Sequence, residues 1–538
     1  MISSKTSSQH PHTTYISTPF NADVGVSASI GARFASIRKC WLKSFVAHCQ
    51  WRQSLHSFYS LYTCYIRTIT CRFHVQHPHQ MTVFESLESL CDSPNIPWKA
   101  IIIGFSAGQF LFETYISYRQ YKALSSNKLP QVLENEIDQE TFEKSEAYSK
   151  AKIRFSVVSD IWSLAQKVAF VKWDFMPRLW HMGDALAATL LPVKYRAVTT
   201  IAQSLWFLLV LSNISTVVEL PFSYYQHFVL EEKFGFNKLT IKIWVTDMIK
   251  STLLGVAIGG PVLYGFLKIF DLFETNFLWY VCLFLLVVQI LAMTLIPVYI
   301  MPLFNTFTPL EDGELKDSIE TLAKKVGFPL DKIFVIDGSK RSSHSNAYFT
   351  GLPFTSKRIV LFDTLVNSNS VDEITAVLAH EIGHWQKNHV LNMVIFSQLH
   401  TFAIFSLFSS VYRNVSFYET FGFFVNAAAP EVSSATQVFT AGFPVIIGFM
   451  LFNDLLTPLE CSMQFAMSLM SRIQEYQADA YAKALGYTQN LCRALIDLQI
   501  KNLSTMNVDS LYSAYHYSHP TLAERLNALG YVSEKKKA

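Results

Sequence analysis

Long apolar stretches dominate the chain from residue 95 onward, with polar segments between them. A helix that spans a bilayer needs about 20 mostly apolar residues. Six clear stretches lie near residues 100–118, 198–218, 245–269, 277–301, 390–411 and 441–464. A seventh, near 157–180, is weaker than these because Lys167, Lys172 and Asp174 interrupt it. The pattern predicts an α-helical multi-pass membrane protein with seven transmembrane helices.

Segment 305–388 has a different pattern, which is typical of a small soluble α/β insert. Its stretches DKIFVID, SNAYFT and KRIVLFD are rich in β-branched and aromatic residues and are bounded by Gly, Pro and Asp, which predicts strands. Ser370 and Glu373 have the spacing of a capping box, in which each side chain bonds the backbone of the other at the start of a helix. We therefore expect a short sheet, followed by a helix that begins at Ser370 and continues through the stretch VLAHEIGHWQKNH.

Composition agrees with a lipid environment. Hydrophobic residues make up 50% of the 538 residues and charged residues only 16%, whereas a soluble domain carries about 25% charged residues. The net charge of +3 is too small to indicate a nucleic-acid partner. The eight cysteines form no CxxC pair, which argues against a disulfide framework and against a zinc site made of thiolates.

The distribution of Lys and Arg predicts the orientation of the spans, because these residues are more frequent in cytosolic loops. The loop 119–154 is rich in Lys and Arg, whereas the short loop 271–275 has none. Seven spans then place the N-terminus in the lumen and the C-terminus in the cytosol. Segments 305–388 and 465–538 share the cytosolic side.

These patterns divide the chain into five parts. Residues 1–94 are expected to be an extension outside the core, with Met81 as a candidate start. Up to residue 80 this part is poor in acids and rich in Ser, which suits a targeting segment, a disordered tail or translated sequence upstream of the true start. The other parts are a membrane domain of five spans, a cytosolic insert, two further spans and a cytosolic C-terminal segment, at residues 95–304, 305–388, 389–464 and 465–538.

The stretch VLAHEIGHWQKNH (377–389) contains the motif HExxH. On a helix this motif places His380 and His384 one turn apart on the same face, so that both rings can bind one Zn²⁺ at about 2.0–2.1 Å. Glu381 cannot easily bind the same ion but can reach a water molecule on it. Zinc lowers the pKa of that water to about 7, and the carboxylate accepts its proton. The motif therefore favours a zinc hydrolase over helix histidines that only form hydrogen bonds.

A catalytic zinc site needs a third protein ligand. The best candidate lies in SRIQEYQADAYA, where Glu475 and Asp479 are four residues apart and face the same way on a helix. We assign Glu475 to the metal and Asp479 to a position behind a ligand histidine, whose tautomer it fixes. The alternative is an acidic, solvent-exposed helix face. His389 follows His384 by five residues, a spacing that turns it away on a continuous helix, so we interpret it as an ordinary interfacial residue.

Two residues near the C-terminus could assist the reaction. The polar stretch SHPTLAERL contains His519 and Arg525. A zinc peptidase needs hydrogen-bond donors for the developing oxyanion, and His519 could be one of them. Arg525 could bind a carbonyl or carboxylate group. The start of a surface helix explains these residues equally well.

With these residues identified, the chain resembles the type I CaaX prenyl proteases, which are membrane zinc endopeptidases that mature prenylated proteins. The resemblance covers about residues 95–530. It rests on seven stretches in order, NIPWKAIIIGFSAGQFLFETYISYRQY, VLEEKFGFN, PLFNTFTPLEDGELK, SHSNAYFTGLP, VLAHEIGHWQKNH, SRIQEYQADAYA and SHPTLAERL.

The resemblance implies seven membrane helices around a large chamber, with a zincin-like insert and one Zn²⁺ per chain on the cytosolic side of its wall. It implies that a strand near Asn346 docks an extended substrate, a mode in which main-chain hydrogen bonds hold any peptide. The implied metal ligands are His380, His384 and Glu475. The implied catalytic residues are Glu381 as the base, with His519 and Arg525 near the scissile bond.

The resemblance also implies a function. Prenylated CaaX proteins would be the substrates, membrane lipid a second partner, and the aaX tripeptide after the lipidated Cys the product. Some members of the family cleave the same precursor again near its N-terminus. The last four residues, KKKA, resemble a di-lysine retrieval signal, which favours the endoplasmic reticulum membrane, or the nuclear envelope continuous with it. A plain basic tail explains KKKA as well, and no oligomeric state is implied.

Three alternatives remain open at this point. A membrane quality-control metalloprotease for unfolded or stalled chains would use the same residues. A metal transporter would need ionisable residues in the middle of facing spans, but the deep acids Glu113 and Asp454 are far from the histidine motif in sequence. A non-catalytic scaffold would have no need for Glu381.

Overall fold

The computed structural model describes residues 95–126, 128–192, 199–274, 276–352, 355–428 and 434–533. The expected extension at 1–94 and the KKKA end therefore lie outside the described residues. Within the described part the chain is mainly helical, with one four-stranded and one two-stranded sheet. The predicted fold class, a multi-pass helical protein with a small α/β part, is confirmed at this level.

Five helical stretches of the described chain are long and apolar enough to cross a membrane. They contain α4 (Trp98–Leu124), α7 (Thr200–Tyr225), α8 (Ile241–Leu254) with α9 (Gly260–Leu272), α10 (Phe277–Leu295) and α14 (His389–Phe408). Three of them include π-helical turns, η3 (Gln226–Glu231), η4 (Gly255–Gly259) and η5 (Ile296–Ile300). A bent pair, α16 (Val445–Leu455) and α17 (Thr457–Ala484), meets the same criterion only when its two helices are taken together, with a bend of 66° between them.

The expected span near 157–180 falls on α5 (Gln139–Lys172) and α6 (Phe175–Leu190). Neither helix is among the five or six candidate spans of the described residues. The number of seven spans therefore stays a prediction.

Two of the three charged residues that weaken this second span, Lys167 and Asp174, have partners of opposite charge. Lys167 of α5 pairs with Asp454 of α16 at 2.6 Å, and Lys99 of α4 pairs with Asp174, which precedes α6, also at 2.6 Å. Pairing reduces the free-energy cost of placing a charge in an apolar environment. A hydropathy criterion counts each charge separately, which explains why α5 fails it although α5 packs along α4.

Removal of one member of the Lys167–Asp454 pair is expected to destabilise the protein more than removal of both. Asp454→Leu leaves the ammonium group of Lys167 unpaired. Breaking a fully buried ion pair in this way costs about 3–5 kcal/mol, and we expect a smaller loss here because both side chains are only partly buried. The double variant with Lys167→Met should unfold near the wild-type temperature, because apolar residues can replace such a pair. Thermal unfolding of the full chain in detergent measures both. Equal losses in the single and double variants would contradict this account.

The predicted sheet is present in segment 305–388 and has one more strand than the sequence pattern indicated. Its order is β1-β2-β4-β3, with β2 and β4 parallel and the outer strands antiparallel to their neighbours. The missed strand β1 has only three residues and ends at Pro309, so it carries little strand signal and suits an edge. The strands are β1 (Phe307–Pro309), β2 (Leu330–Ile336), β3 (Ala347–Thr350) and β4 (Lys357–Phe362).

The helix α13 (Val371–Gln386) begins at the predicted capping box. The hydroxyl of Ser370 accepts a hydrogen bond from the backbone N–H of Glu373, whose carboxylate accepts one from the N–H of Ser370 at 2.9 Å. Every side chain from Ile374 to His384 is buried. This helix packs against α11 (Glu314–Val326), β3, α17 and α18 (Thr488–Lys501), so its HExxH motif lies inside the protein.

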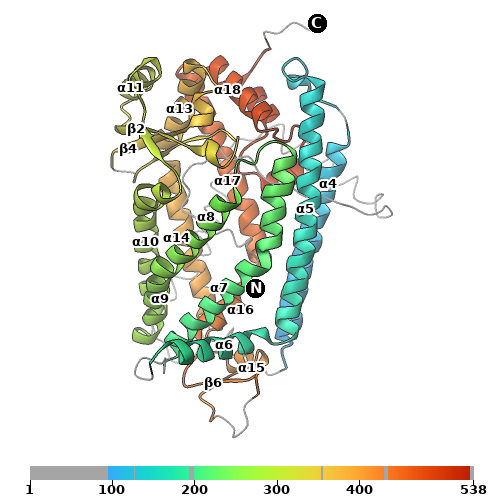
Figure 1. Ribbon diagram of the computed structural model, residues 1–538, viewed down its shortest axis with the longest axis vertical. Coiled ribbons are helices and arrows are strands. Elements are labelled where there is room, and N and C mark those ends of the chain that lie inside the picture. The colour runs from blue at the N-terminus through green and yellow to red at the C-terminus, as the bar shows by residue number, and fades with distance from the viewer. Residues whose placement is uncertain are drawn as a thin grey trace, which may run out of the picture. The chain divides into compact units, whose positions relative to one another are not determined.

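One hydrophobic core joins three separate segments of the chain. Leu133 and Ile137 come from the loop after α4, Leu378 from α13, and Leu495 and Leu526 from the C-terminal segment. The insert and the C-terminal segment therefore share one core and are not independent folding units. Figure 1 shows β2, β4, α11, α13 and α18 at one end of the long helices.

Short elements complete the described chain. The opposite end of the long helices carries α6, α15 and β6 (Figure 1). Strands β5 and β6 pair in parallel. The remaining elements are η1 (Gln131–Leu133), η6 (Met301–Leu303), η7 (Gly338–Lys340), α12 (Asp363–Val366), α15 (Val415–Thr420), β5 (Phe423–Val425), β6 (Val438–Thr440), α19 (Ser510–His516) and α20 (Leu522–Leu529).

Candidate active site

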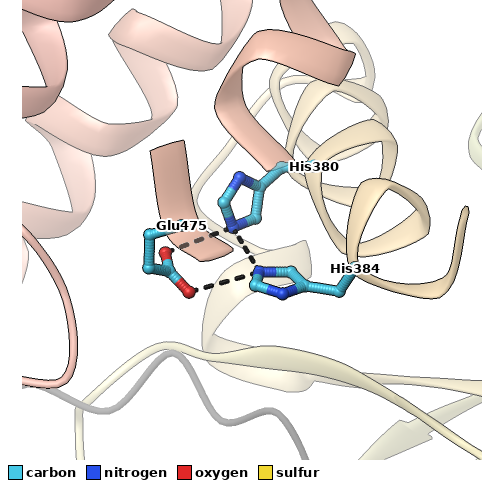
Figure 2. Close-up of side chains that lie close together, drawn as sticks. All are labelled: His380, His384 and Glu475. Atoms are coloured by element: carbon cyan, nitrogen blue, oxygen red, sulfur yellow. Dashed lines mark hydrogen bonds and ion pairs between the residues drawn. The ribbon is translucent and has the colours of Figure 1, made fainter. Parts of the chain in front are cut away.

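Three side chains from α13 and α17 form a group that could hold a metal ion (Figure 2). Nε2 of His380 lies 3.2 Å from Nε2 of His384. The carboxylate of Glu475 places one oxygen 3.2 Å from Nε2 of His384 and the other 3.4 Å from Nε2 of His380. The exposed fraction is 1% for His380, 4% for His384 and 2% for Glu475. The structure thus brings together all three expected ligands.

The group fits a zinc ion in both distance and chemistry. Ligand atoms of a tetrahedral zinc site at about 2.0–2.1 Å from the metal are about 3.3–3.4 Å apart, close to the three separations above. Oε2 of Glu475 and both carboxylate oxygens of Glu381 are buried and form no hydrogen bond within the described part of the chain. Buried carboxylate oxygens normally have partners, and a divalent cation with its water would supply them.

The close crossing of α13 and α17 explains why a glycine stands inside HEIGH. A Cβ atom at Gly383 would lie 3.0 Å from Cα of Ala478 and 3.1 Å from its carbonyl oxygen. The small residues Gly383 and Ala478 therefore let the two backbones approach. This approach brings Glu475, one turn before Asp479 on α17, within reach of the histidines on α13.

Asp479 lies behind the first histidine, as expected. Its Oδ1 is 2.9 Å from Nδ1 of His380. Arg525 of α20 donates to both carboxylate oxygens of Asp479, at 2.9 and 2.6 Å, and its Nη1 is 3.6 Å from Glu475. The contacts with Asp479 use Nε and Nη2 of the guanidinium group and give Arg525 a role in holding Asp479, while its expected binding of a substrate carbonyl stays a prediction.

The charges around the site favour a cation. Burial raises the pKa of Glu381 to about 8. Burial alone would lower the pKa of His380, but Asp479 and Glu475 raise it to about 9. The carboxylates thus attract a proton to the position where a metal would bind. A divalent cation there favours the ionised Glu381 and the neutral His380, because it supplies the missing positive charge.

His519 reaches the same site from the segment between α19 and α20. Its Nε2 is 3.4 Å from Oε1 of Glu475, and burial lowers its pKa. Arg472 of α17, which the sequence analysis did not single out, holds this segment. Its Nη2 donates to both oxygens of Glu524 at 2.8 and 2.9 Å, and Nη1 lies 3.4 Å from the carbonyl oxygen of His519. The only sequence signal for Arg472 was its place one turn before Glu475.

Asn346 lies next to the edge strand and outside the metal group. Its Oδ1 accepts a hydrogen bond from the N–H of Ala347 at 2.8 Å, and its carbonyl oxygen accepts one from the N–H of Phe362 at 3.1 Å. It immediately precedes β3, which pairs with β4 on one side and packs against α13. The structure therefore places Asn346 immediately before the strand that was expected to dock a substrate.

The interpretation of His389 as an ordinary interfacial residue was wrong. The helix α13 ends at Gln386, Asn388 adopts a left-handed conformation with φ of 54°, and α14 begins at His389. This turn directs the imidazole back to the site, where it is buried, with Nδ1 2.9 Å from Nδ1 of His384. Asn388 was the available signal, because Asn often ends a helix in this conformation.

Two family models together match most of the described chain. Residues 120–306 match the family model described as the CAAX prenyl protease N-terminal domain with five membrane helices, and residues 309–533 match peptidase family M48. CAAX prenyl protease 1 of Saccharomyces cerevisiae is 73% identical over 451 residues, which cover 84% of this chain and 99% of that protein. The Homo sapiens homolog is 35% identical over 490 residues, which cover 84% and 99%.

A solved structure also matches this chain. The crystal structure of S. mikatae Ste24p is 74% identical and has a TM-score of 0.78, and the match covers 81% of this chain and 100% of that one. The resemblance noted from the seven sequence stretches is therefore confirmed. With both family models matched in order along the chain, and with relatives covered almost end to end, the chain belongs to the M48 peptidases and, within them, to the CAAX prenyl proteases.

Proposed function

We propose that the chain is a zinc metalloendopeptidase of the endoplasmic reticulum membrane that removes the aaX tripeptide from prenylated CaaX proteins. The observation that carries the proposal is the buried group His380, His384 and Glu475, with the unpartnered carboxylate of Glu381 beside it. The relatives named CAAX prenyl protease 1 support the substrate class. The proposal includes one Zn²⁺ per chain, seven spans around a chamber, the five parts outlined above and a catalytic end that faces the cytosol.

In this proposal each side chain has a separate task. Bound zinc supplies Lewis acidity and lowers the pKa of a water molecule. Glu381 accepts the proton of the attacking water and later donates it to the leaving amine. His519, beside Glu475, donates a hydrogen bond to the developing oxyanion. Asp479, held by Arg525, accepts a hydrogen bond from Nδ1 of His380 and thereby keeps its Nε2 available for the metal.

The substrate is proposed to dock as an extra strand along β3. In this mode the main chain of an extended peptide pairs with the free edge of the sheet, and pockets select its side chains. Because β3 packs against α13, a peptide on this edge would run beside the HExxH helix. Asn346, at the start of β3, is proposed to contact the substrate. A second cleavage, nearer the N-terminus of the same precursor, would use the same edge.

The test uses the full chain, purified in detergent, with a farnesylated CaaX peptide and the same peptide without the lipid. We expect release of the aaX tripeptide from the farnesylated peptide and a zinc content near one per chain. Zinc without cleavage of this peptide, together with cleavage of an unfolded protein, would instead support a quality-control protease. The absence of both zinc and cleavage would contradict the proposal.

A further inference from the structure

We propose that His389 is a positioning residue that fixes the tautomer and ring orientation of the metal ligand His384, through a hydrogen-bond chain that ends at Gln477. The inference rests on the proposed zinc site. It concerns His384, the second ligand histidine. Asp479 accepts from Nδ1 of His380, whereas no carboxylate contacts Nδ1 of His384 among the contacts that the structure describes.

The geometry forms a continuous chain of three side chains. Nδ1 of His384 lies 2.9 Å from Nδ1 of His389, and Nε2 of His389 lies 2.9 Å from Oε1 of Gln477. The two imidazole rings are nearly perpendicular, at 75°. Gln477 is an exposed residue of α17, between Glu475 and Asp479 in the sequence. The chain therefore leads from the buried site to the surface of the helix that carries the third ligand.

Only one direction of these hydrogen bonds is compatible with metal binding. Two ring nitrogens can share a hydrogen bond only if one is protonated and the other is not. Nε2 of His384 faces Glu475 and His380 and must be unprotonated to bind a metal, so the proton of this neutral ring is on Nδ1. His384 then donates to Nδ1 of His389, and His389 donates from Nε2 to the amide oxygen of Gln477.

The reverse direction would disable the site. If His389 donated from Nδ1 to His384, the proton of His384 would be on Nε2, in the position of the metal. The carbonyl oxygen of Gln477 can only accept, so it holds the proton of His389 on Nε2 and excludes this arrangement. The chain thus selects the metal-binding tautomer of His384 without a second carboxylate, and the two ligand histidines receive different support.

The test compares two substitutions in the full chain in detergent. His389→Phe keeps a ring but removes the acceptor, and we expect zinc affinity, measured by competition with a chelator, to fall about 10–100-fold, as for other outer-shell partners. His389→Asn offers an oxygen near the position of Nδ1, so its zinc affinity should be close to wild type. His400→Phe, the same substitution farther along α14, is the matched control and should leave zinc affinity unchanged.

The outcomes separate this inference from the proposed function. Wild-type protein without zinc would overturn both. If the wild-type protein binds zinc, two results would overturn the inference alone. One is an equal zinc affinity of His389→Phe, and the other is a loss of zinc affinity in His389→Asn as large as that in His389→Phe. Gln477→Glu provides a test if His389→Phe fails to fold, because residue 477 is exposed. The stronger acceptor should raise zinc affinity, and no rise would contradict the proposed chain.

Discussion

Glu381→Gln is expected to lower the rate of cleavage of a farnesylated CaaX peptide by about 10²–10⁴-fold, the usual contribution of a general base, while zinc remains bound. Both carboxylate oxygens of Glu381 are buried and have no hydrogen-bond partner among the residues that the structure describes. The amide of Gln has nearly the same size but cannot accept the proton of water. The measurement pairs single-turnover release of the aaX tripeptide with the zinc content of the same samples.

A matched control on the same helix shows whether the effect belongs to the site. Asp372 lies in the first turn of α13 and is exposed, so Asp372→Asn should cleave at the wild-type rate. Wild-type cleavage by Glu381→Gln would remove Glu381 from the mechanism. Loss of zinc from Glu381→Gln would instead assign Glu381 to metal binding and contradict its role as the base.

Glu475→Ala is expected to abolish both zinc binding and cleavage. Two histidines without a third protein ligand do not complete a catalytic zinc site. The loss of affinity should therefore exceed the about 10–100-fold typical of outer-shell residues, and Asp479→Asn should fall between Glu475→Ala and wild type. Zinc affinity by chelator competition and peptide cleavage provide the two readouts.

Glu460→Ala is the control for this second experiment. Glu460 belongs to the first turn of the same helix, and its side chain is 45% exposed, so zinc and activity should be unchanged. Full zinc retention by Glu475→Ala would contradict the assignment of Glu475. Such retention would point to His519, whose Nε2 is 3.4 Å from Oε1 of Glu475, as the third ligand.

The features that sequence predicted well depend on local patterns. Ser370 and Glu373 determine the start of α13 through contacts only three residues apart, and the spacing of His380 and His384 follows from one helical turn. The three predicted strands agree with β2, β3 and β4 within a few residues, because their apolar runs end at Gly, Pro or Asp. Glu475 was predicted as the third ligand because it shares a helix face with Asp479, and the structure places it beside both histidines.

The features that sequence missed depend on contacts between distant segments. Lys167 made the second span look weak, because its partner Asp454 is nearly three hundred residues away along the chain and no local window contains both. His389 was assigned to a continuous helix, whereas one left-handed residue, Asn388, interrupts the helix just before it. Arg525 was expected to bind a substrate group, which stays a prediction, and only the folded chain showed that its Nε and Nη2 also hold Asp479.

The core shared by the insert and the C-terminal segment has a consequence for biosynthesis. His380 and His384 are translated before the last membrane helices, whereas Glu475, Asp479 and the core residue Leu526 follow them. A ribosome-bound chain that has completed only the HExxH helix lacks both its third ligand and part of the core that buries the motif. We therefore expect the nascent protease to be inactive until α17 and α20 have been synthesised and can pack against α13.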